Sequence, residues 1–252
     1  MAASFRLDGR RAIVTGASRG LGAAMTRALA EAGADVAGVA TGDLAATGSV
    51  VRDRGRRFVA IAEDLADTDA PGRIVARAVE AFGGVDILVN NAGIIRRADA
   101  LDFTQEDWND VLDVNLKAAF FLAQAVARRL VEQRHGGKIV NVASMLSFQG
   151  GVRVASYTAS KSGILGLTRL LANEWAACGI NVNAIAPVFT LTAINRSLLA
   201  EPSKLEWVMS RIPMKRLGEL EDLFGPVIFL ASDASNFVNG HVLPVDGGWL
   251  GA

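Results

Sequence analysis

Residues 12–22 read AIVTGASRGLG, and they determine how the first part of the chain folds. The apolar run 12–15 is typical of a short buried strand, and a glycine-rich turn follows it directly. A helical pattern then covers residues 23–32 and ends at Gly33, a residue type that favours helix C-termini. Glycines at 16, 20 and 22 would let the backbone approach a pyrophosphate at the helix N-terminus. The segment therefore predicts a strand, a dinucleotide-binding loop and a helix.

The same alternation of strand and helix continues to the end of the chain. Further strands are expected at residues 35–40, 58–62, 86–89, 138–143, 181–185 and 242–245. Helices are expected between them, at residues 43–54, 67–82, 115–134, 156–177 and 219–232, with Asp67 as a helix cap. This pattern predicts an α/β fold, a Rossmann-type doubly wound parallel sheet with helices on both faces. No repeat or linker divides residues 1–252, so we expect a single domain.

The composition narrows the classes of partner. The 252 residues carry 26 basic and 26 acidic side chains, without a run of like charge, so neither nucleic acid nor an anionic membrane is an expected partner. No apolar stretch reaches the roughly 18 residues of a membrane span, and we find no signal-peptide pattern. The single cysteine, Cys178, excludes an intrachain disulfide and suits the cytoplasm. We expect a cytoplasmic protein with no metal site.

A second informative segment, residues 144–161, reads SMLSFQGGVRVASYTASK. Tyr157 and Lys161 are four residues apart and would share one face of a helix. A cation beside a phenol lowers the phenol pKa from its ordinary value near ~10, so Tyr157 could exchange a proton with a substrate oxygen. Ser144 could hold the same oxygen by a hydrogen bond. The alternative is a packed tyrosine beside a lysine whose stem lies on the surface.

The position of polar and glycine-rich segments decides between these alternatives. Residues 16–22, Asp64, residues 90–93, Ser144 and residues 187–192 all follow predicted strands. In a parallel sheet, ligands bind at the carboxyl ends of the strands, so these segments should lie along one edge. This agreement favours Tyr157 as a catalytic residue.

The choice of nicotinamide cofactor depends on the end of the second strand. An acidic residue there would bind the ribose hydroxyls of NAD, but the chain has Thr41, and Asp43 comes two residues late. Arg19, inside the glycine-rich loop, could pair with the 2′-phosphate of NADP instead. Its alternative role is that of a solvated loop arginine. We favour NADP without excluding NAD.

Other residues after strands suit the remaining parts of such a cofactor. Asp64 could accept a hydrogen bond from the adenine amino group, with Leu65 packed beside the ring. Residues 91–93, Asn-Ala-Gly, would line the adenosine ribose. Asn115 is expected either to cap the helix that it begins or to hold a water that returns protons to Lys161.

With these residues assembled, the chain resembles the short-chain dehydrogenase/reductase family over its whole length. The motifs that carry the resemblance are Thr15-Gly16-x-x-x-Gly20-x-Gly22, Asn90-Asn91-Ala92-Gly93, Asn115, Ser144, Tyr157-x-x-x-Lys161 and Pro187. The resemblance implies a seven-stranded sheet, a homotetramer and a catalytic tetrad of Asn115, Ser144, Tyr157 and Lys161. It also implies that Lys161 grips the nicotinamide ribose.

A finer resemblance within the family is carried by residues 90–97 (NNAGIIRR), 144–151 (SMLSFQGG), 156–163 (SYTASKSG), 173–175 (NEW) and 246–250 (DGGWL). On these segments the sequence looks most like the 2-deoxy-D-gluconate 3-dehydrogenases (2-dehydro-3-deoxy-D-gluconate 5-dehydrogenases) and the gluconate 5-dehydrogenases. Ser18-Arg19 departs from that mostly NAD-linked group toward NADP-dependent relatives, and Val188 replaces a usual glycine. Thr190 or Thr192 could contact the nicotinamide carboxamide. The predicted cofactor contacts are Gly16, Ser18, Arg19, Gly20, Leu21, Gly22, Thr41, Asp64, Leu65, Asn91, Ala92, Gly93, Tyr157, Lys161, Pro187, Val188, Thr190 and Thr192.

A sugar-acid substrate would present a carboxylate and several hydroxyl groups, which call for an arginine and a few polar side chains. Arg96, Arg97, Arg153 and Gln149 are the candidates, each of which could instead be a surface residue. Residues 189–214 are expected to form a lid over the substrate.

Two other functions are weighed against a sugar-acid oxidoreductase. A 3-oxoacyl carrier-protein reductase would need a basic docking surface, and the available cations are interspersed with Glu201 and Glu206; they are Arg196, Lys204, Arg211, Lys215 and Arg216. A non-catalytic, cofactor-sensing scaffold is disfavoured by the complete tetrad.

Overall fold

The structure is a computed structural model that describes residues 4–192, 195 and 199–251. Seven parallel strands form one sheet in the order β3-β2-β1-β4-β5-β6-β7, so the predicted fold class is confirmed. The strands are β1 (Arg11–Thr15), β2 (Asp35–Ala40), β3 (Phe58–Ala62), β4 (Ile87–Asn90), β5 (Gly137–Val142), β6 (Ile180–Pro187) and β7 (Val242–Val245). The chain order reverses between β1 and β4, which are adjacent. That reversal makes the crevice at which such sheets bind ligands.

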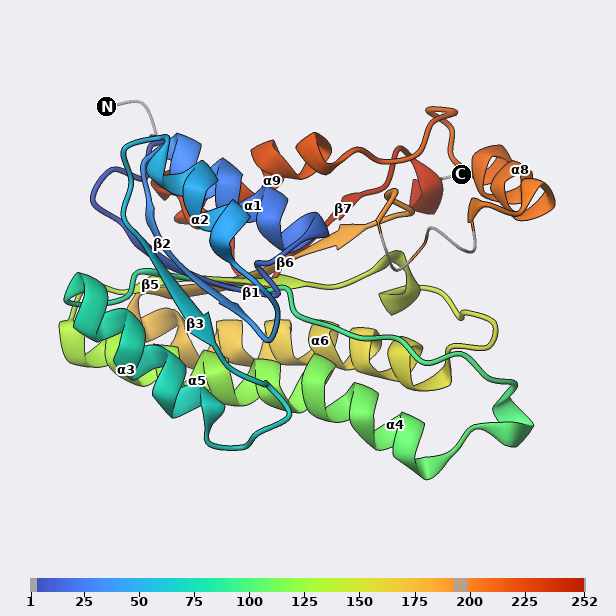
Figure 1. Cartoon of the computed structure of the whole chain (residues 1–252), viewed down its shortest axis with the longest axis horizontal. Helices are drawn as coiled ribbons and strands as arrows, with labels where there is room; N and C mark the ends of the chain where they lie inside the picture. The colour runs from blue at the N-terminus through green and yellow to red at the C-terminus, as the bar shows by residue number, and fades with distance from the viewer. Residues whose placement is uncertain (1–3, 193–194, 196–198, 252) are drawn as a thin grey trace.

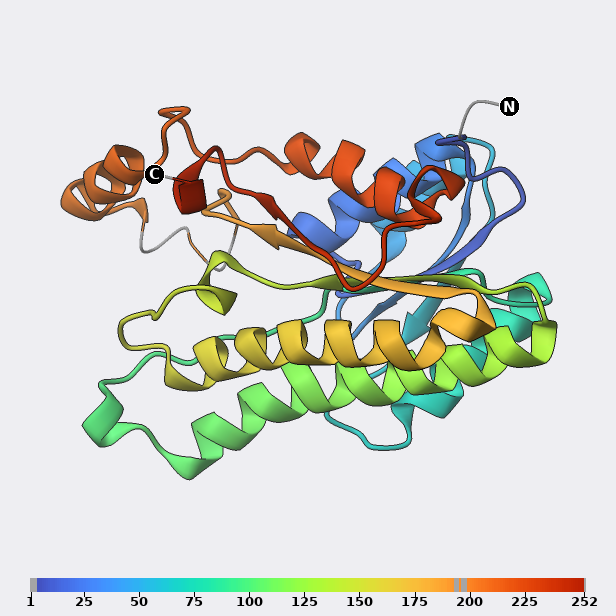
Figure 2. The same ribbon diagram turned by 180° about the vertical axis from the view of Figure 1, so that it is seen from behind.

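Helices cover both faces of the sheet (Figures 1 and 2). One layer contains α1 (Gly20–Ala32), α2 (Ala45–Arg52) and α9 (Phe224–Ala231). The other contains α3 (Ala70–Phe82), α4 (Gln105–Leu112), α5 (Ala118–Gln133) and α6 (Ala155–Trp175). A further helix, α8 (Pro202–Arg211), lies beside the C-terminal segment, beyond the carboxyl ends of β6 and β7 (Figure 1).

The sequence of β1 explains why the sheet is covered on both sides. Successive side chains of a strand point to opposite faces. Val14 belongs to the core cluster that contains Met25 of α1, whereas Ile13 belongs to the one that contains Leu122 of α5. All four apolar side chains are at most 1% exposed. A strand buried on both faces therefore requires the continuous apolar run seen in the sequence.

The predicted start of the helix at Asn115 is wrong. The helical segment begins ten residues earlier with α4, where the Thr104 hydroxyl accepts a hydrogen bond from the backbone N–H of Asp107 at 3.1 Å. Asn115 lies in a π-helical turn, Asp113–Lys117, that joins α4 to α5. Such turns inside α-helices occur frequently at functional sites. The early start follows from the capping residue Thr104 and the acidic first turn.

Two smaller expectations also change. Helix α3 begins at Ala70, because the Asp67 carboxylate accepts from the Asp69 backbone N–H at 2.9 Å instead of capping a helix. The predicted lid contains the regular helix α8, whereas residues 193–194 and 196–198, including Arg196, lie outside the described residues. Cys178 is exposed. Among the helices that the structure describes, none has the length and apolar character needed to cross a membrane.

Candidate active site

The four predicted catalytic residues come from β5, α6 and the turn before α5. Ser144 follows the carboxyl end of β5, and Tyr157 and Lys161 occupy the first turns of α6. A hydrogen bond joins the hydroxyl groups of Ser144 and Tyr157. The Lys161 Nζ lies 5.7 Å from the centre of the Tyr157 ring. The geometry therefore brings the serine, tyrosine and lysine together.

The pKa of Tyr157 is raised in the structure, whereas the sequence analysis expected it to be lowered. Burial raises the pKa of Tyr157, while the hydrogen bond with Ser144 and the positive charge of Arg97 lower it. Burial lowers the pKa of Lys161 to about 8. The Lys161 ammonium is 4% exposed and donates to the carbonyl oxygen of Val142 at 2.6 Å. In this structure the positive charge of Arg97 favours the phenolate.

Asn115 holds the segment that follows β4. Its Oδ1 accepts from the backbone N–H of Ile94 at 2.8 Å, and its Nδ2 donates to the Ile94 carbonyl at 3.0 Å. The same Nδ2 donates to the Ser160 hydroxyl at 3.2 Å, and that hydroxyl donates to the Tyr157 carbonyl at 2.8 Å. The predicted capping role is wrong. The amide instead connects the π-helical turn to the catalytic helix.

Ser147 is a functional residue that the sequence analysis missed. Its hydroxyl donates to the Lys161 carbonyl at 2.6 Å and accepts from the Ser144 backbone N–H at 3.2 Å. One side chain therefore joins the loop that carries Ser144 to the helix that carries Tyr157 and Lys161. The signal was available as a serine three residues after Ser144, which completes a capping box.

The glycine-rich loop forms the cradle that a pyrophosphate requires. Gly16 and Gly20 have φ angles of 65° and 56°, in the region that favours glycine. A Cβ added to Gly22 would collide with the carbonyl oxygen of Gly16. Asn91 supports the loop, since its Nδ2 donates to the Thr15 carbonyl at 2.8 Å. The Asn91 side chain faces the glycine-rich loop. The predicted contact with the ribose would therefore come from Ala92 and Gly93.

Two further contacts define the edges of the loop. The Thr47 hydroxyl of α2 donates to the Ala17 carbonyl at 2.9 Å, a support that the sequence analysis missed. The Thr192 methyl group would lie 3.8 Å from a Cβ on Gly20, so the predicted lid segment begins above the loop. Leu21 and Gly22 continue from the loop into α1.

The residues at the predicted site of the adenine ribose fit NADP. Arg19 is exposed at the N-terminus of α1, and no side-chain contact holds it within the described residues. Thr41, after β2, is exposed, and the Asp43 carboxylate accepts from the Ala45 backbone N–H at 2.8 Å. Gly42 lies beside Ser18. A 2′-phosphate would therefore meet a cation without a carboxylate at the strand end.

The other predicted cofactor residues lie at the same edge. Asp64 is exposed after β3, beside partly buried Leu65. Pro187 ends β6. The backbone N–H of Val188 donates to the backbone carbonyl of Val245 at 3.2 Å. Val188 thus continues the pairing with β7, which explains how the chain accommodates a residue other than glycine. The Thr190 hydroxyl donates to the Val188 carbonyl at 3.3 Å, whereas Ala92 and Gly93 follow β4 beside Asn115.

The four substrate candidates have different surroundings. Arg96 pairs with two carboxylates of α4, Asp107 at 3.2 Å and Asp110 at 3.0 Å. Arg153 pairs with Asp99 at 3.2 Å. Arg97 is the candidate whose charge acts on Tyr157.

Gln149 belongs to the group that positions the predicted lid. Its Oε1 accepts from the buried Trp249 indole at 3.0 Å. Trp249 stacks edge-on with Trp207 of α8 at 5.7 Å, and the Arg211 guanidinium lies 4.8 Å from the Trp249 ring. The C-terminal segment thus fastens α8 beside the site. No cluster of metal-ligand side chains occurs in residues 4–192, 195 or 199–251.

Comparisons with known proteins agree with this geometry. A family model described as "Enoyl-(Acyl carrier protein) reductase" matches residues 16–250. The 2-dehydro-3-deoxy-D-gluconate 5-dehydrogenase of Dickeya dadantii is 52% identical over 98% of both chains. An Agrobacterium tumefaciens structure with bound NADP, whose proposed identity is 2-deoxy-D-gluconate 3-dehydrogenase, is 49% identical with a TM-score of 0.92, covering 98% of this chain and 99% of that one.

A gluconate 5-dehydrogenase of Burkholderia cenocepacia, solved with NADP and tartrate, is 40% identical with a TM-score of 0.94 over 98% of both chains. The match therefore extends over the whole site and is not confined to the glycine-rich loop. The chain belongs to the short-chain dehydrogenase/reductase family, whose members are NAD(P)-dependent oxidoreductases acting on CH–OH groups.

Proposed function

We propose that this protein interconverts a secondary alcohol and a ketone on a sugar acid, gluconate or a deoxygluconate, with NADP as the preferred cofactor. The observation that carries the substrate class is the similarity over nearly the whole chain to sugar-acid dehydrogenases, and Arg97, whose charge acts on Tyr157, is the cation that we assign to the substrate carboxylate. A guanidinium at that place suits a substrate that has a carboxylate a few bonds from its reacting carbon. The names of the relatives support the same class.

Each residue of the tetrad has a separate role in the proposed reaction. Tyr157 exchanges a proton with the substrate oxygen, and Ser144 holds that oxygen through its hydroxyl. Lys161 is fixed by the Val142 carbonyl and has further N–H groups for ribose hydroxyls. Asn115 keeps the segment at Ile94 in place beside the site. NADP, when bound, accepts or supplies the hydride.

The cofactor would be held by the cradle at the carboxyl ends of the strands. The glycine-rich loop faces the pyrophosphate, and Arg19 takes the 2′-phosphate. Asp64 and Leu65 flank the adenine, and Thr190 or Thr192 contacts the nicotinamide. Buried Thr190 is held by the backbone, so Thr192, above Gly20, is the better placed of the two threonines.

The charges around α8 disfavour a carrier-protein substrate. Lys204 pairs with Glu201 at 2.5 Å, and Arg216 pairs with Asp222 at 2.6 Å. Arg211 lies over the Trp249 ring. An acidic partner protein would therefore find Lys204 and Arg216 already paired with carboxylates. Lys215 is exposed and donates to the Ser210 carbonyl at 3.2 Å, and Arg196 falls outside the described residues.

We also propose that the protein is a cytoplasmic homotetramer. Phe121 on α5 and Leu170 on α6 are 45% and 47% exposed, so both helices have apolar side chains outside the core. Leu165 on α6, by contrast, is 8% exposed and belongs to the core. A helix that is apolar beyond its core face needs a second partner. Light scattering at micromolar concentration should give four chains, and a monomer would contradict the proposal.

Steady-state turnover tests the proposed function. The panel is gluconate and 2-dehydro-3-deoxygluconate, the uncharged sorbitol, and acetoacetyl thioesters, each with NADP(H) and NAD(H). We expect the highest kcat/KM for a sugar acid with the NADP form. A thioester turned over faster than every sugar acid would establish carrier-protein reduction instead. No turnover of any substrate would favour the non-catalytic scaffold.

A further inference from the structure

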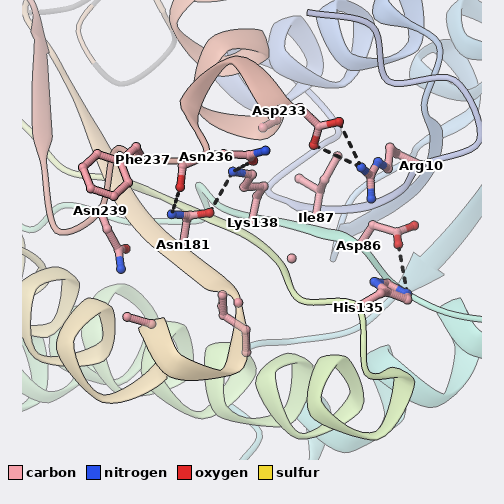
Figure 3. Close-up of a pocket in the computed structure, with 15 residues that line it drawn as sticks. Arg10, Asp86, Ile87, His135, Lys138, Asn181, Asp233, Asn236, Phe237 and Asn239 are labelled. Carbon is pink, nitrogen blue, oxygen red and sulfur yellow. Dashed lines mark hydrogen bonds and ion pairs between the residues drawn. The ribbon is translucent and has the colours of Figure 1, made fainter. Parts of the chain in front are cut away.

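A cavity of about 630 Å³ lies at the amino ends of the strands, the edge of the sheet opposite Tyr157. Its walls are the starts of β5 and β6 and the residues just before β1 and β4. The C-terminal ends of α5, α6 and α9 surround it (Figure 3). Its volume is within the usual range for small-molecule sites, about 300–1,000 Å³. The active site described above uses none of its lining residues.

Lys138 is the unusual residue of this cavity. Its side chain lines the cavity although the residue is only 7% exposed. The ammonium donates to the Oδ1 atoms of Asn181 at 2.8 Å and Asn236 at 2.7 Å (Figure 3). These partners are neutral, and an ammonium has three N–H donors. A buried cation is therefore left with one donor and no carboxylate partner among the described residues.

The two carboxylates of the cavity are committed elsewhere. Asp86 accepts two hydrogen bonds from the Arg11 guanidinium, at 2.6 and 2.9 Å, and one from the Arg11 backbone at 2.8 Å. Asp233 accepts from Arg10 Nη2 at 3.1 Å. Once these pairs are formed, Lys138 is the one charged side chain of the lining without an ion-pair partner, although the nearby charges of Asp233 and Arg10 raise and lower its pKa, respectively. Buried charges in proteins are normally paired, so this one calls for an anionic partner.

We propose that the cavity is a second, non-catalytic site for a small hydroxylated monocarboxylate. Its carboxylate would accept from the third N–H of Lys138 and from the Asn236 Nδ2, which donates to no described residue. The unused N–H groups of Arg10 lie on the same wall. Phe237, an exposed aromatic residue of the lining, offers apolar surface to a carbon chain. One positive charge without an ion-pair partner matches a monoanion, whereas Asp86 and Asp233 would repel a dianion.

Lysine NMR tests this site directly and independently of the proposed catalytic function. The chain has five lysines, so protein labelled with ¹³C-lysine gives few resonances. Lys138→Met and Lys161→Arg assign the two buried ones. We expect sodium gluconate to shift the Lys138 signal and to raise its titration midpoint above about 8, because a bound anion favours the ammonium. Sorbitol, and sodium chloride at equal ionic strength, should leave it unchanged.

Two outcomes of the titration would overturn the proposal. A Lys138 signal that ignores gluconate would mean that the negative ends of the surrounding helices alone compensate the charge. An equal response to sodium sulfate would mean a general anion site and not one for a monocarboxylate.

A pair of matched variants checks the geometry. Asn236→Asp places a permanent carboxylate beside Lys138, so it should raise the Lys138 titration midpoint without ligand and remove the response to gluconate. Ala234→Asp adds the same charge two residues away, outside the lining, and should keep the response. Gluconate binding of wild-type strength in Asn236→Asp would contradict the site.

Discussion

The Lys161 ammonium lies 5.7 Å from the centre of the Tyr157 ring, yet it donates to the Val142 carbonyl and not to the phenol. The lysine is thus anchored to the end of β5, the strand that leads to Ser144. Its position is fixed by the sheet, whereas that of Tyr157 is fixed by α6. Proton exchange at Tyr157 therefore depends on how α6 is held against β5, which the Ser147 hydroxyl does through the Lys161 carbonyl.

Replacing the catalytic phenol should remove turnover. Tyr157→Phe keeps the ring but removes the proton donor, and positioned acid–base groups contribute about 10²–10⁴-fold. We expect kcat to fall by at least about 100-fold, with NADP affinity nearly unchanged in a fluorescence titration. Ser162→Ala, an exposed change on the same helix, is the control. Activity within tenfold of the unsubstituted enzyme would disprove the assignment.

Arg97 should control recognition of the substrate carboxylate. A charge-assisted hydrogen bond contributes about 1.5–3 kcal/mol, so Arg97→Gln should raise KM for gluconate roughly 10–100-fold. The KM for the uncharged sorbitol should change little, and the effect of Arg97 on the Tyr157 pKa should alter kcat for both substrates alike. Arg153→Gln serves as the control, because Arg153 pairs with Asp99. A similar loss for gluconate and sorbitol would show that Arg97 acts on the chemistry and not on the carboxylate.

The same variant can be followed through the tyrosine itself. Tyr157 is the sole tyrosine, so ultraviolet titration without cofactor reports its ionisation alone. Because burial raises the pKa of Tyr157, the midpoint should lie above the ordinary ~10. Arg97→Gln should raise it further, since the Arg97 charge lowers that pKa. A midpoint that does not respond to Arg97→Gln would remove the electrostatic link.

Arg19 should determine the preference for NADP. Its guanidinium can pair with the 2′-phosphate, so Arg19→Ala should weaken NADP binding by about one to two decades and leave NAD binding almost unchanged. Arg77→Ala, an exposed arginine paired with Glu80, is the control in calorimetric titrations. An equal fall for both cofactors would mean that Arg19 only shapes the loop. If the wild-type protein prefers NAD, then Thr41 or Asp43 must bind the hydroxyl groups of the adenosine ribose.

The two buried lysines should make folding stability rise with pH. Burial lowers the pKa of both Lys138 and Lys161 to about 8 in the folded chain, against 10.5 ordinarily. Between those values the unfolded chain binds protons that the folded chain does not, so the free energy of unfolding increases with pH. The increase should be roughly 2 kcal/mol per lysine from about pH 7.5 to 9.5.

Urea unfolding at several pH values measures this dependence. Lys161→Met and Lys138→Met should each remove about half of the increase relative to wild type, and Lys204→Met, at an exposed ion pair, should remove none. A pH dependence unaffected by either buried substitution would show that neither lysine is held neutral above pH 8.

Much of the fold was predictable from local pattern. The run of residues 12–15 is apolar on both faces, and such a strand is stable only inside a parallel sheet covered by helices. The glycines at 16, 20 and 22 are required by backbone geometry, which acts over a few residues. The sequence therefore predicted the strand order along the chain, the glycine-rich loop and the meeting of Ser144, Tyr157 and Lys161 at one edge.

Contacts between distant segments were not predictable in the same way. Nothing local distinguishes Arg96, which pairs with α4, from Arg97, whose charge reaches Tyr157. The support of the glycine-rich loop by Thr47 and the clamp of Ile94 by Asn115 likewise join segments from different strands. Periodicity specifies which face of an element is buried, but a hydrogen bond or ion pair forms only where packing brings its two groups within about 3 Å. The sequence by itself determined the sheet and the meeting of Ser144, Tyr157 and Lys161 at one edge of it, and the tertiary structure decided the partner of each polar side chain because that distance is set by packing.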